Sequence, residues 1–192
     1  FPIGIDVAAF AEMARLPSSE VELDTLRQRI LGRKQIIGVD RLDYSKGLEE
    51  RFLGFERFLI ENPDQRREVL MLQIAPVSRE AVEAYQEIRS RLDSLSGRIN
   101  GEFSDVDWAP FRYVNKNYRC DELAGIYGVA RVGLVTPLRD GMNLVAKEFV
   151  AAQNPDDPGV LILSRFAGAA GQMSEALLVN PNSTEEVADA PV

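Results

Sequence analysis

Two cations, Arg41 and Lys46, lie on one short polar segment, residues 38–47, with the sequence GVDRLDYSKG. An arginine presents a planar fork that holds two phosphate oxygens and a lysine presents a mobile point charge, so together they suit a diphosphate. Gly47 allows the backbone to turn into a following helix. The segment is not a P-loop, because the spacing GxxxxGK followed by Ser or Thr is absent. The alternative interpretation is two solvated cations that pair with the aspartates of the same segment.

A second polar segment, residues 137–148, combines a predicted anion site with two carboxylates. Gly141 allows a sharp turn, after which the amides of residues 142–144 form a helix N-terminus that can hold an anion. Asp140 stands at the mouth of this turn and can accept hydrogen bonds from sugar hydroxyls. Glu148 lies two turns further along the same helix face, where a carboxylate can bind a ribose diol. The alternative is an ordinary first-turn acid followed by a solvated glutamate.

A third segment, residues 73–79 with the sequence QIAPVSR, ends in a cation at a predicted helix start. Ser78 can cap this helix, and Arg79 then falls in its first turn. A cation at that position opposes the helix dipole and needs a compensating anion, which indicates a bound phosphate. The alternative is a helix-start arginine that faces water.

The carboxylates of Asp105 and Asp107 form a DxD triplet, which in one class of sugar transferase holds a divalent cation that bridges a diphosphate. Here the triplet follows no buried apolar strand and is predicted to lie in a loop. The sequence also contains no histidine, the commonest metal ligand and general base. We therefore expect no metal site.

Short apolar runs rich in Val, Ile and Leu alternate with segments of helical periodicity along most of the chain. This alternation predicts a parallel sheet with crossover helices, with strands buried on both faces. The predicted strands are residues 36–39, 69–75, 111–114, 132–136, 160–163 and 176–179. The predicted helices are residues 7–15, 19–31, 48–61 and 79–95, with a further helix start near residue 183. Ligands bind outside the carboxyl ends of parallel strands, so the three polar segments lie where a site is expected.

The composition is that of one globular domain, because 192 residues with 45% hydrophobic and 27% charged side chains exclude a disordered or collagen-like chain. The formal net charge of −8 argues against non-specific binding of nucleic acid. One cysteine forms no internal disulfide, and no apolar run approaches the roughly 20 residues of a membrane span, so we expect a cytoplasmic protein. The chain begins with Phe1 and stops about two turns after the helix start near residue 183, so we expect both of its ends to be cut edges of something larger.

The motifs VDRLDYSKG, QIAPVSR, GLVTPLRDGMNLVAKEFVAAQ and LSRFAGAA, in this order, resemble the trehalose-6-phosphate synthase family of UDP-forming retaining glucosyltransferases. The resemblance runs over essentially the whole chain. It implies a Rossmann-like parallel sheet of about six strands with flanking helices, the C-terminal domain of a two-domain GT-B glycosyltransferase. Residues 1–192 would then be a single donor-binding domain, and the N-terminal acceptor-side domain would be absent.

The resemblance also implies a role for each residue of the matching motifs. Arg41 and Lys46 would hold the UDP diphosphate, and together with Asp140 they would be the catalytic residues. Arg79 would reach the phosphate of glucose 6-phosphate, and Tyr118 would lie near the uracil. The implied donor-binding residues are Arg41, Lys46, Tyr118, Asp140, Gly141, Met142, Asn143, Leu144, Val145 and Glu148. Among these, Asp140 and the backbone of 141–143 would bind the glucose, the amides of Leu144 and Val145 the phosphate, and Glu148 the ribose.

The implied reaction transfers glucose from UDP-glucose to glucose 6-phosphate with retention, giving trehalose 6-phosphate and UDP. It needs no metal and no cofactor, since UDP-glucose is a substrate, and the complete enzyme could be a homo-oligomer. One alternative is a sister enzyme with another acceptor, such as a glucosylglycerol-phosphate synthase or a pseudo-glycosyltransferase that couples cyclitols. Another is a nucleotide-sugar-binding module without catalysis, which we expect for these residues in isolation. A structural domain that binds nothing is the third.

Overall fold

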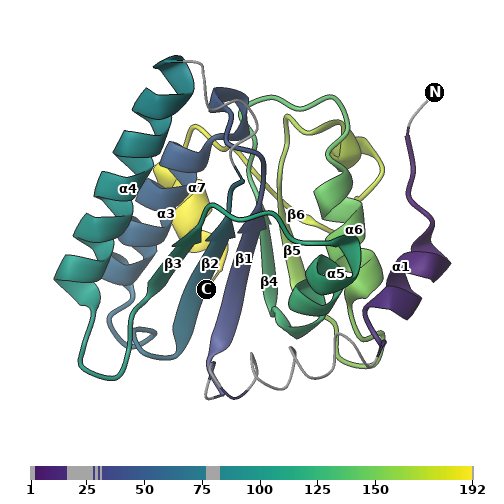
Figure 1. Cartoon of the computed structure of the whole chain (residues 1–192), viewed down its shortest axis with the longest axis horizontal. Coiled ribbons are helices and arrows are strands. Elements are labelled where there is room, and N and C mark those ends of the chain that lie inside the picture. Colours follow the sequence, from purple (N-terminus) through teal and green to yellow (C-terminus); the bar gives the residue numbers. More distant parts are fainter. Residues whose placement is uncertain (1–2, 17–27, 29, 31, 77–82, 192) are drawn as a thin grey trace.

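The protein is described by a computed structural model that covers residues 3–16, 28, 30, 32–76 and 83–191. Its centre is one sheet of six parallel strands in the order β3-β2-β1-β4-β5-β6 (Figure 1). The strands are β1 (Lys34–Val39), β2 (Val69–Ile74), β3 (Phe111–Val114), β4 (Val132–Val135), β5 (Val160–Ser164) and β6 (Leu177–Val179). All six predicted strands are therefore confirmed. The order has the form of a doubly wound, Rossmann-like sheet, in which β1 and β4 start the two halves.

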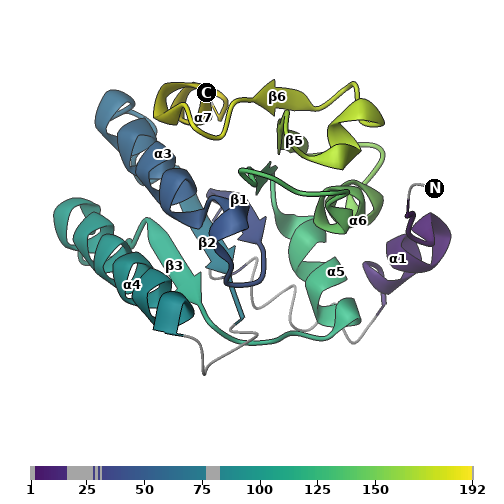
Figure 2. The ribbon, with the colours of Figure 1, turned by 90° about the horizontal axis from the view of Figure 1, so that it is seen from above.

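Helices cover both faces of the sheet (Figure 2). One face carries α3 (Leu48–Glu61), α4 (Glu83–Phe103) and α7 (Thr184–Asp189). The other face carries α1 (Val7–Met13), α5 (Cys120–Val129) and α6 (Leu144–Ala152). Two short 3-10 turns, η1 (Tyr44–Lys46) and η2 (Gly168–Gly171), follow β1 and β5. The bounds of α3 agree with the prediction, and Ser183 caps α7 where a helix start was expected.

The prediction of a helix over residues 79–95 was too short at its C-terminal end, because α4 continues to Phe103. The reason is packing, since Ile99 is fully buried and Phe103 packs against the same core. Residues 79–82, and almost all of the helix predicted over residues 19–31, lie outside the described part of the chain. At the N-terminus, α1 ends two residues before the predicted boundary at 15.

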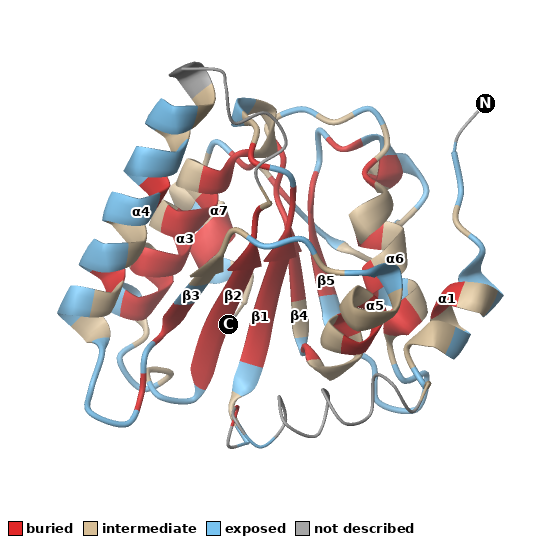
Figure 3. Cartoon of the chain, viewed as in Figure 1, coloured by how far each residue is buried: buried red, intermediate tan, exposed pale blue. Residues whose placement is uncertain are grey.

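The core has two layers, one on each side of the sheet, and successive strand residues enter opposite layers. Ile36 packs with α3 and α4, whereas its neighbour Ile37 packs with α5 and α6. The central strands β1 and β2 are almost wholly buried (Figure 3). Such burial holds the carboxyl ends of these strands in fixed positions, which matters for the loops that leave them. Within the described residues, no helix has the length and apolar character to cross a membrane.

Candidate functional site

Three loops that follow β1, β4 and β5 converge at the carboxyl edge of the sheet and are joined through their backbones. The amides of Leu138 and Arg139 both donate to the carbonyl oxygen of Ser45, at 2.9 and 3.2 Å. The amide of Gly168 donates to the carbonyl oxygen of Asp140 at 3.1 Å. The topology thus brings segments far apart in the sequence into one backbone-linked unit.

Lys46 and Asp140 meet in this unit, although 94 residues separate them in the chain. The ammonium group of Lys46 forms an ion pair with Oδ2 of Asp140, and both side chains are about 15% exposed. The same oxygen accepts a hydrogen bond from Nδ2 of Asn143 at 3.2 Å. Two residues predicted from separate motifs are therefore in direct contact, and a small part of each side chain is exposed.

The turn η1 presents Lys46, and two local features set its conformation. Asp43 caps it by accepting hydrogen bonds from the amide and the hydroxyl of Ser45, at 2.8 and 2.7 Å. Burial raises the pKa of Asp43, but the hydrogen bonds from Ser45 and Tyr85 and the charge of Lys46 outweigh it and leave this pKa below its ordinary value. Gly47 has φ 62°, and a Cβ there would lie 2.6 Å from the carbonyl oxygen of Thr136. Only glycine fits, as the sequence predicted.

The N-terminus of α6 points into the same region but begins later than the sequence suggested. We expected the amides of residues 142–144 to form it after a turn at Gly141. In the structure the left-handed residue is Asn143, with φ 69°, and its side chain caps the helix by accepting from the amide of Ala146 at 3.1 Å. The helix therefore starts at Leu144. Because the first amides of a helix have no intrahelical acceptor, those of Leu144 and Val145 can donate to an anion.

Arg41 lies in the loop that follows β1, and Glu148 lies on α6. Arg41 is exposed and forms no ion pair or hydrogen bond with any residue that the structure describes, so its guanidinium is available to a ligand. Glu148 is half-buried on α6, near Tyr127 and Cys120 of α5. Burial raises the pKa of the Glu148 carboxyl, and the nearby Tyr127 hydroxyl lowers it only in part. Burial also raises the pKa of Tyr127 well above its ordinary value.

Tyr118, the residue expected near the base, lies just before α5 and is partly buried against the α5–α6 layer. Lys116 places its ammonium group 5.2 Å from the centre of the Tyr118 ring. Tyr118 therefore lies beside α5, the helix whose residues Tyr127 and Cys120 are near Glu148. Arg79, expected to bind the acceptor phosphate, lies outside the described residues.

The DxD triplet lies at the opposite edge of the sheet, in the loop between α4 and β3. Both of its carboxylates are bound by one guanidinium, because Arg67 donates to Asp105 at 2.7 Å and to Asp107 at 2.5 Å. The triplet therefore takes part in a surface ion-pair cluster remote from the converging loops.

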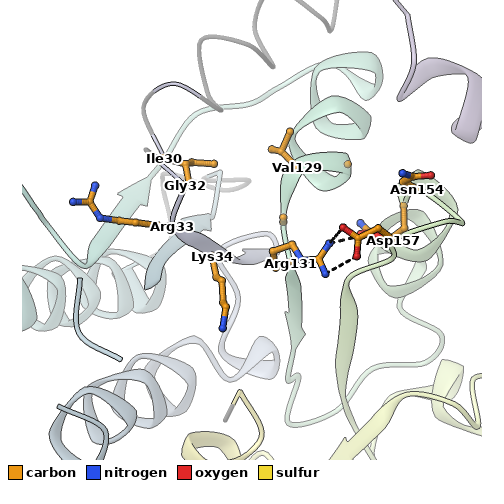
Figure 4. A pocket seen from close by; sticks show the side chains of 11 residues that line it. Ile30, Gly32, Arg33, Lys34, Val129, Arg131, Asn154 and Asp157 are labelled. Atoms are coloured by element: carbon orange, nitrogen blue, oxygen red, sulfur yellow. Dashed lines mark hydrogen bonds and ion pairs between the residues drawn. The ribbon is translucent and has the colours of Figure 1, made fainter. Parts of the chain in front are cut away.

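A hollow of about 500 Å³ at that same edge contains none of the residues predicted for the site. Arg131, a cation that lines the hollow, donates hydrogen bonds to both carboxylate oxygens of Asp157, at 2.9 and 3.0 Å. Arg33 and Lys34 extend away from the hollow (Figure 4). The charges that border it are thus either paired or directed elsewhere.

Sequence reasoning missed one cluster beneath the converging loops, which is built around Arg51 of α3. This side chain is fully buried and forms an ion pair with Asp40 at 2.7 Å. A usable signal was present, because Arg51 falls between Leu48, Phe52 and Phe55 on the buried face of its helix. A charged residue on that face needs partners inside the protein.

Comparison with known proteins identifies the relatives of this chain. The model of glycosyltransferase family 20 matches residues 1–191. A trehalose-6-phosphate synthase of Sinorhizobium fredii is 54% identical over 190 residues, which are 99% of this chain and 41% of that protein. The chain therefore spans about two fifths of the length of such curated relatives.

Solved structures agree with the family match. A UDP-forming α,α-trehalose-phosphate synthase from Burkholderia xenovorans, in complex with glucose-6-phosphate, superposes with a TM-score of 0.97 at 50% identity. An E. coli structure bound with UDP-2-fluoro glucose superposes with a TM-score of 0.95 at 48% identity. Each comparison covers 100% of this chain and 42% of the other. The six-stranded parallel sheet with its flanking helices is thus the fold of one part of these proteins.

Proposed function

Because the chain belongs to glycosyltransferase family 20, we propose that it supplies the donor-binding half of a retaining glucosyltransferase. The complete enzyme transfers glucose from UDP-glucose to glucose 6-phosphate, giving trehalose 6-phosphate and UDP. The observation that carries the proposal is the meeting of Lys46, Asp140 and the N-terminus of α6 at the convergence of three strand ends. The N-terminal half of the enzyme provides the rest of the acceptor side.

The diphosphate of the donor is held by three kinds of positive group. Arg41 offers a guanidinium that has no partner among the described residues, Lys46 offers an ammonium group, and the amides of Leu144 and Val145 offer the positive end of a helix. Negative charge develops on the leaving UDP during glucosyl transfer, and groups already in place at that position stabilise it without reorganisation. This arrangement can act without a metal ion.

The carboxylates bind the sugars of the donor. Asp140 and the backbone of residues 141–143 bind the glucose, while Glu148 accepts hydrogen bonds from the ribose and the backbone near Tyr118 contacts the uracil. When UDP-glucose binds, Lys46 moves from the Asp140 carboxylate toward the diphosphate and frees that carboxylate for the glucose hydroxyls. The leaving phosphate takes the proton of the acceptor hydroxyl on the same face, so no side chain of this half is required as a base.

The acceptor side is shared between this chain and the other half. We propose that Arg79 binds the phosphate of glucose 6-phosphate. The chain alone binds nucleotide sugar without turnover, because it spans only about two fifths of the length of its relatives. A sister enzyme with another acceptor would use the same donor residues, and an acceptor competition assay on the complete enzyme separates the two.

Titration of UDP and UDP-glucose against this chain by calorimetry tests the proposal. We expect both ligands to bind, and we expect Lys46→Met to weaken binding by roughly 10- to 150-fold, the effect of losing one charge-assisted hydrogen bond of about 1.5 to 3 kcal/mol. The matched control is Lys34→Met, which removes an exposed cation at the opposite edge and should leave binding unchanged. Equal UDP affinity in the two variants contradicts the diphosphate assignment.

A further inference from the structure

Arg51 is a fully buried cation in the first turn of α3, directly after the segment that carries Lys46. Arginine is almost never fully buried without partners, and a cation in the first turn opposes the helix dipole. Both facts make this an unfavourable position for a residue that serves α3 alone. The partners of the guanidinium show what else it serves.

Three of these partners come from the carboxyl ends of three strands. Nη1 donates to Asp40 Oδ2 at 2.7 Å and to Gln73 Oε1 at 2.9 Å, and Nε donates to Thr136 Oγ1 at 2.9 Å. Asp40 directly follows β1, Gln73 lies in β2, and Thr136 directly follows β4. All three residues are buried. One guanidinium therefore joins the ends of the strands that lead into the functional loops.

The fourth partner is the backbone of the segment 38–47, which carries Arg41 and Lys46. Nη2 of Arg51 donates to the carbonyl oxygen of Lys46 at 3.4 Å, and the amide of Arg51 donates to that of Gly47 at 3.0 Å. Gly47 in turn rests against the carbonyl oxygen of Thr136. The guanidinium thus uses four of its N–H groups, and the last of them holds the residue whose side chain faces Asp140.

Gly38 makes room for this cluster inside the sheet. A Cβ at Gly38 would lie 2.8 Å from Nη1 of Arg51 and would overlap Oε1 of Gln73. The missing side chain of a central β1 residue is therefore the space in which the guanidinium and its partners meet. The cluster is built into the sheet and is not a chance surface contact.

We propose that Arg51 is a positioning residue for donor binding, which fixes the Lys46 backbone against the ends of β1, β2 and β4. It touches no substrate and acts through Lys46, so the inference rests on the proposed function. A purely structural role would also lower stability on mutation, because loss of Arg51 leaves Asp40 buried without a counter-charge. The test must therefore separate ligand affinity from stability.

A double-mutant cycle makes this separation, with UDP affinity of this chain measured by calorimetry below the unfolding transition. We expect Arg51→Met to weaken UDP binding by about tenfold, comparable to losing one charge-assisted contact. In the double variant with Lys46→Met, we expect the same loss of UDP affinity as in Lys46→Met alone. Once the Lys46 side chain is absent, the position of its backbone no longer affects binding. Asp40→Asn combined with Arg51→Met removes both buried charges and serves if Arg51→Met alone does not fold.

The control is Trp108→Phe, which removes the hydrogen bond from the indole to the carbonyl oxygen of Val69 at the opposite edge. It should lower the unfolding temperature without changing UDP affinity. If the losses of UDP affinity in Arg51→Met and Lys46→Met add in the double variant, the positioning role is wrong. Full UDP affinity in the Asp40→Asn/Arg51→Met variant also contradicts it. Either result leaves the proposed function standing. Failure of the unmodified chain to bind UDP overturns the proposed function and this inference together.

Discussion

Gly168 offers the sharpest steric test of the converging loops. It follows β5 and packs against the turn that carries Asp140. A Cβ at this position would lie 2.7 Å from the carbonyl carbon of Gly141 and would overlap its oxygen, whereas real Cβ atoms stay beyond about 3.0 Å. The obstacle is backbone and not a flexible side-chain end, so Gly168→Ala must displace one of the two loops. The displacement reaches the segment that we propose holds the donor glucose.

The loss of stability in Gly168→Ala can be calculated from the backbone hydrogen bonds between these loops. Gly168 donates to the Asp140 carbonyl oxygen at 3.1 Å, and the amide of Ala169 donates to that of Met142 at 2.7 Å. Loss of both bonds, at about 1 kcal/mol each, lowers the free energy of unfolding by about 2 kcal/mol. For a chain of this size the unfolding temperature then falls by roughly 4–8 °C. UDP-glucose affinity should fall more than UDP affinity, because the moved turn borders the sugar.

The matched control is Gly171→Ala in the same 3-10 turn. A Cβ at Gly171 meets nothing within 4 Å, and its φ is not positive, so this substitution should leave both measurements unchanged. Differential scanning fluorimetry and calorimetry with the two ligands provide the readouts. The reasoning fails if Gly168→Ala retains both its unfolding temperature and its UDP-glucose affinity, or if the two alanine variants behave alike.

Three further outcomes are expected. Glu148→Gln should weaken the binding of UDP but not the binding of 2′,3′-dideoxy-UDP. The same substitution should raise the unfolding temperature at neutral pH, because folding raises the pKa of this carboxyl and its ionised form therefore destabilises the folded protein. This gain in unfolding temperature should vanish as the pH falls through the raised pKa. Arg79→Ala should leave UDP affinity of this chain unchanged while weakening use of glucose 6-phosphate by the complete enzyme roughly 10- to 150-fold. UDP binding should persist in EDTA, and loss of UDP affinity in EDTA would contradict a diphosphate site that acts without a metal ion.

Most of the fold could be predicted from local patterns, because strands buried on both faces appear as apolar runs and amphipathic helices show their period. The errors lie where tertiary packing decides. α4 runs on to Phe103 because Ile99 continues its buried face, which the polar residues around it obscure. The start of α6 was misplaced because the side chain of Asn143, and not the turn at Gly141, determines it.

The sequence predicted that Lys46 and Asp140 lie in one region, but it did not predict their contact. The rule that parallel strands present their carboxyl ends at one edge was enough to expect Lys46 and Asp140 in one region. Their ion pair joins positions 94 residues apart, and no local pattern specifies such a pairing. The role of Arg51 was not predicted for the same reason. Its partners Gln73 and Thr136 lie in or next to other strands, far from it in the sequence.

These contacts bear on how a donor half can be ready before an acceptor half is present. The Lys46 turn, the Asp140 turn and the Gly168 turn hold one another through backbone hydrogen bonds within this chain. Beneath them, Arg51 ties the first of these turns to three strand ends whose side chains are buried. Because none of these contacts needs a residue from outside the chain, this chain alone holds the three turns in place. If the proposed function holds, we expect nucleotide-sugar binding and turnover to be separable, with this sheet determining the first and the joining of both halves determining the second.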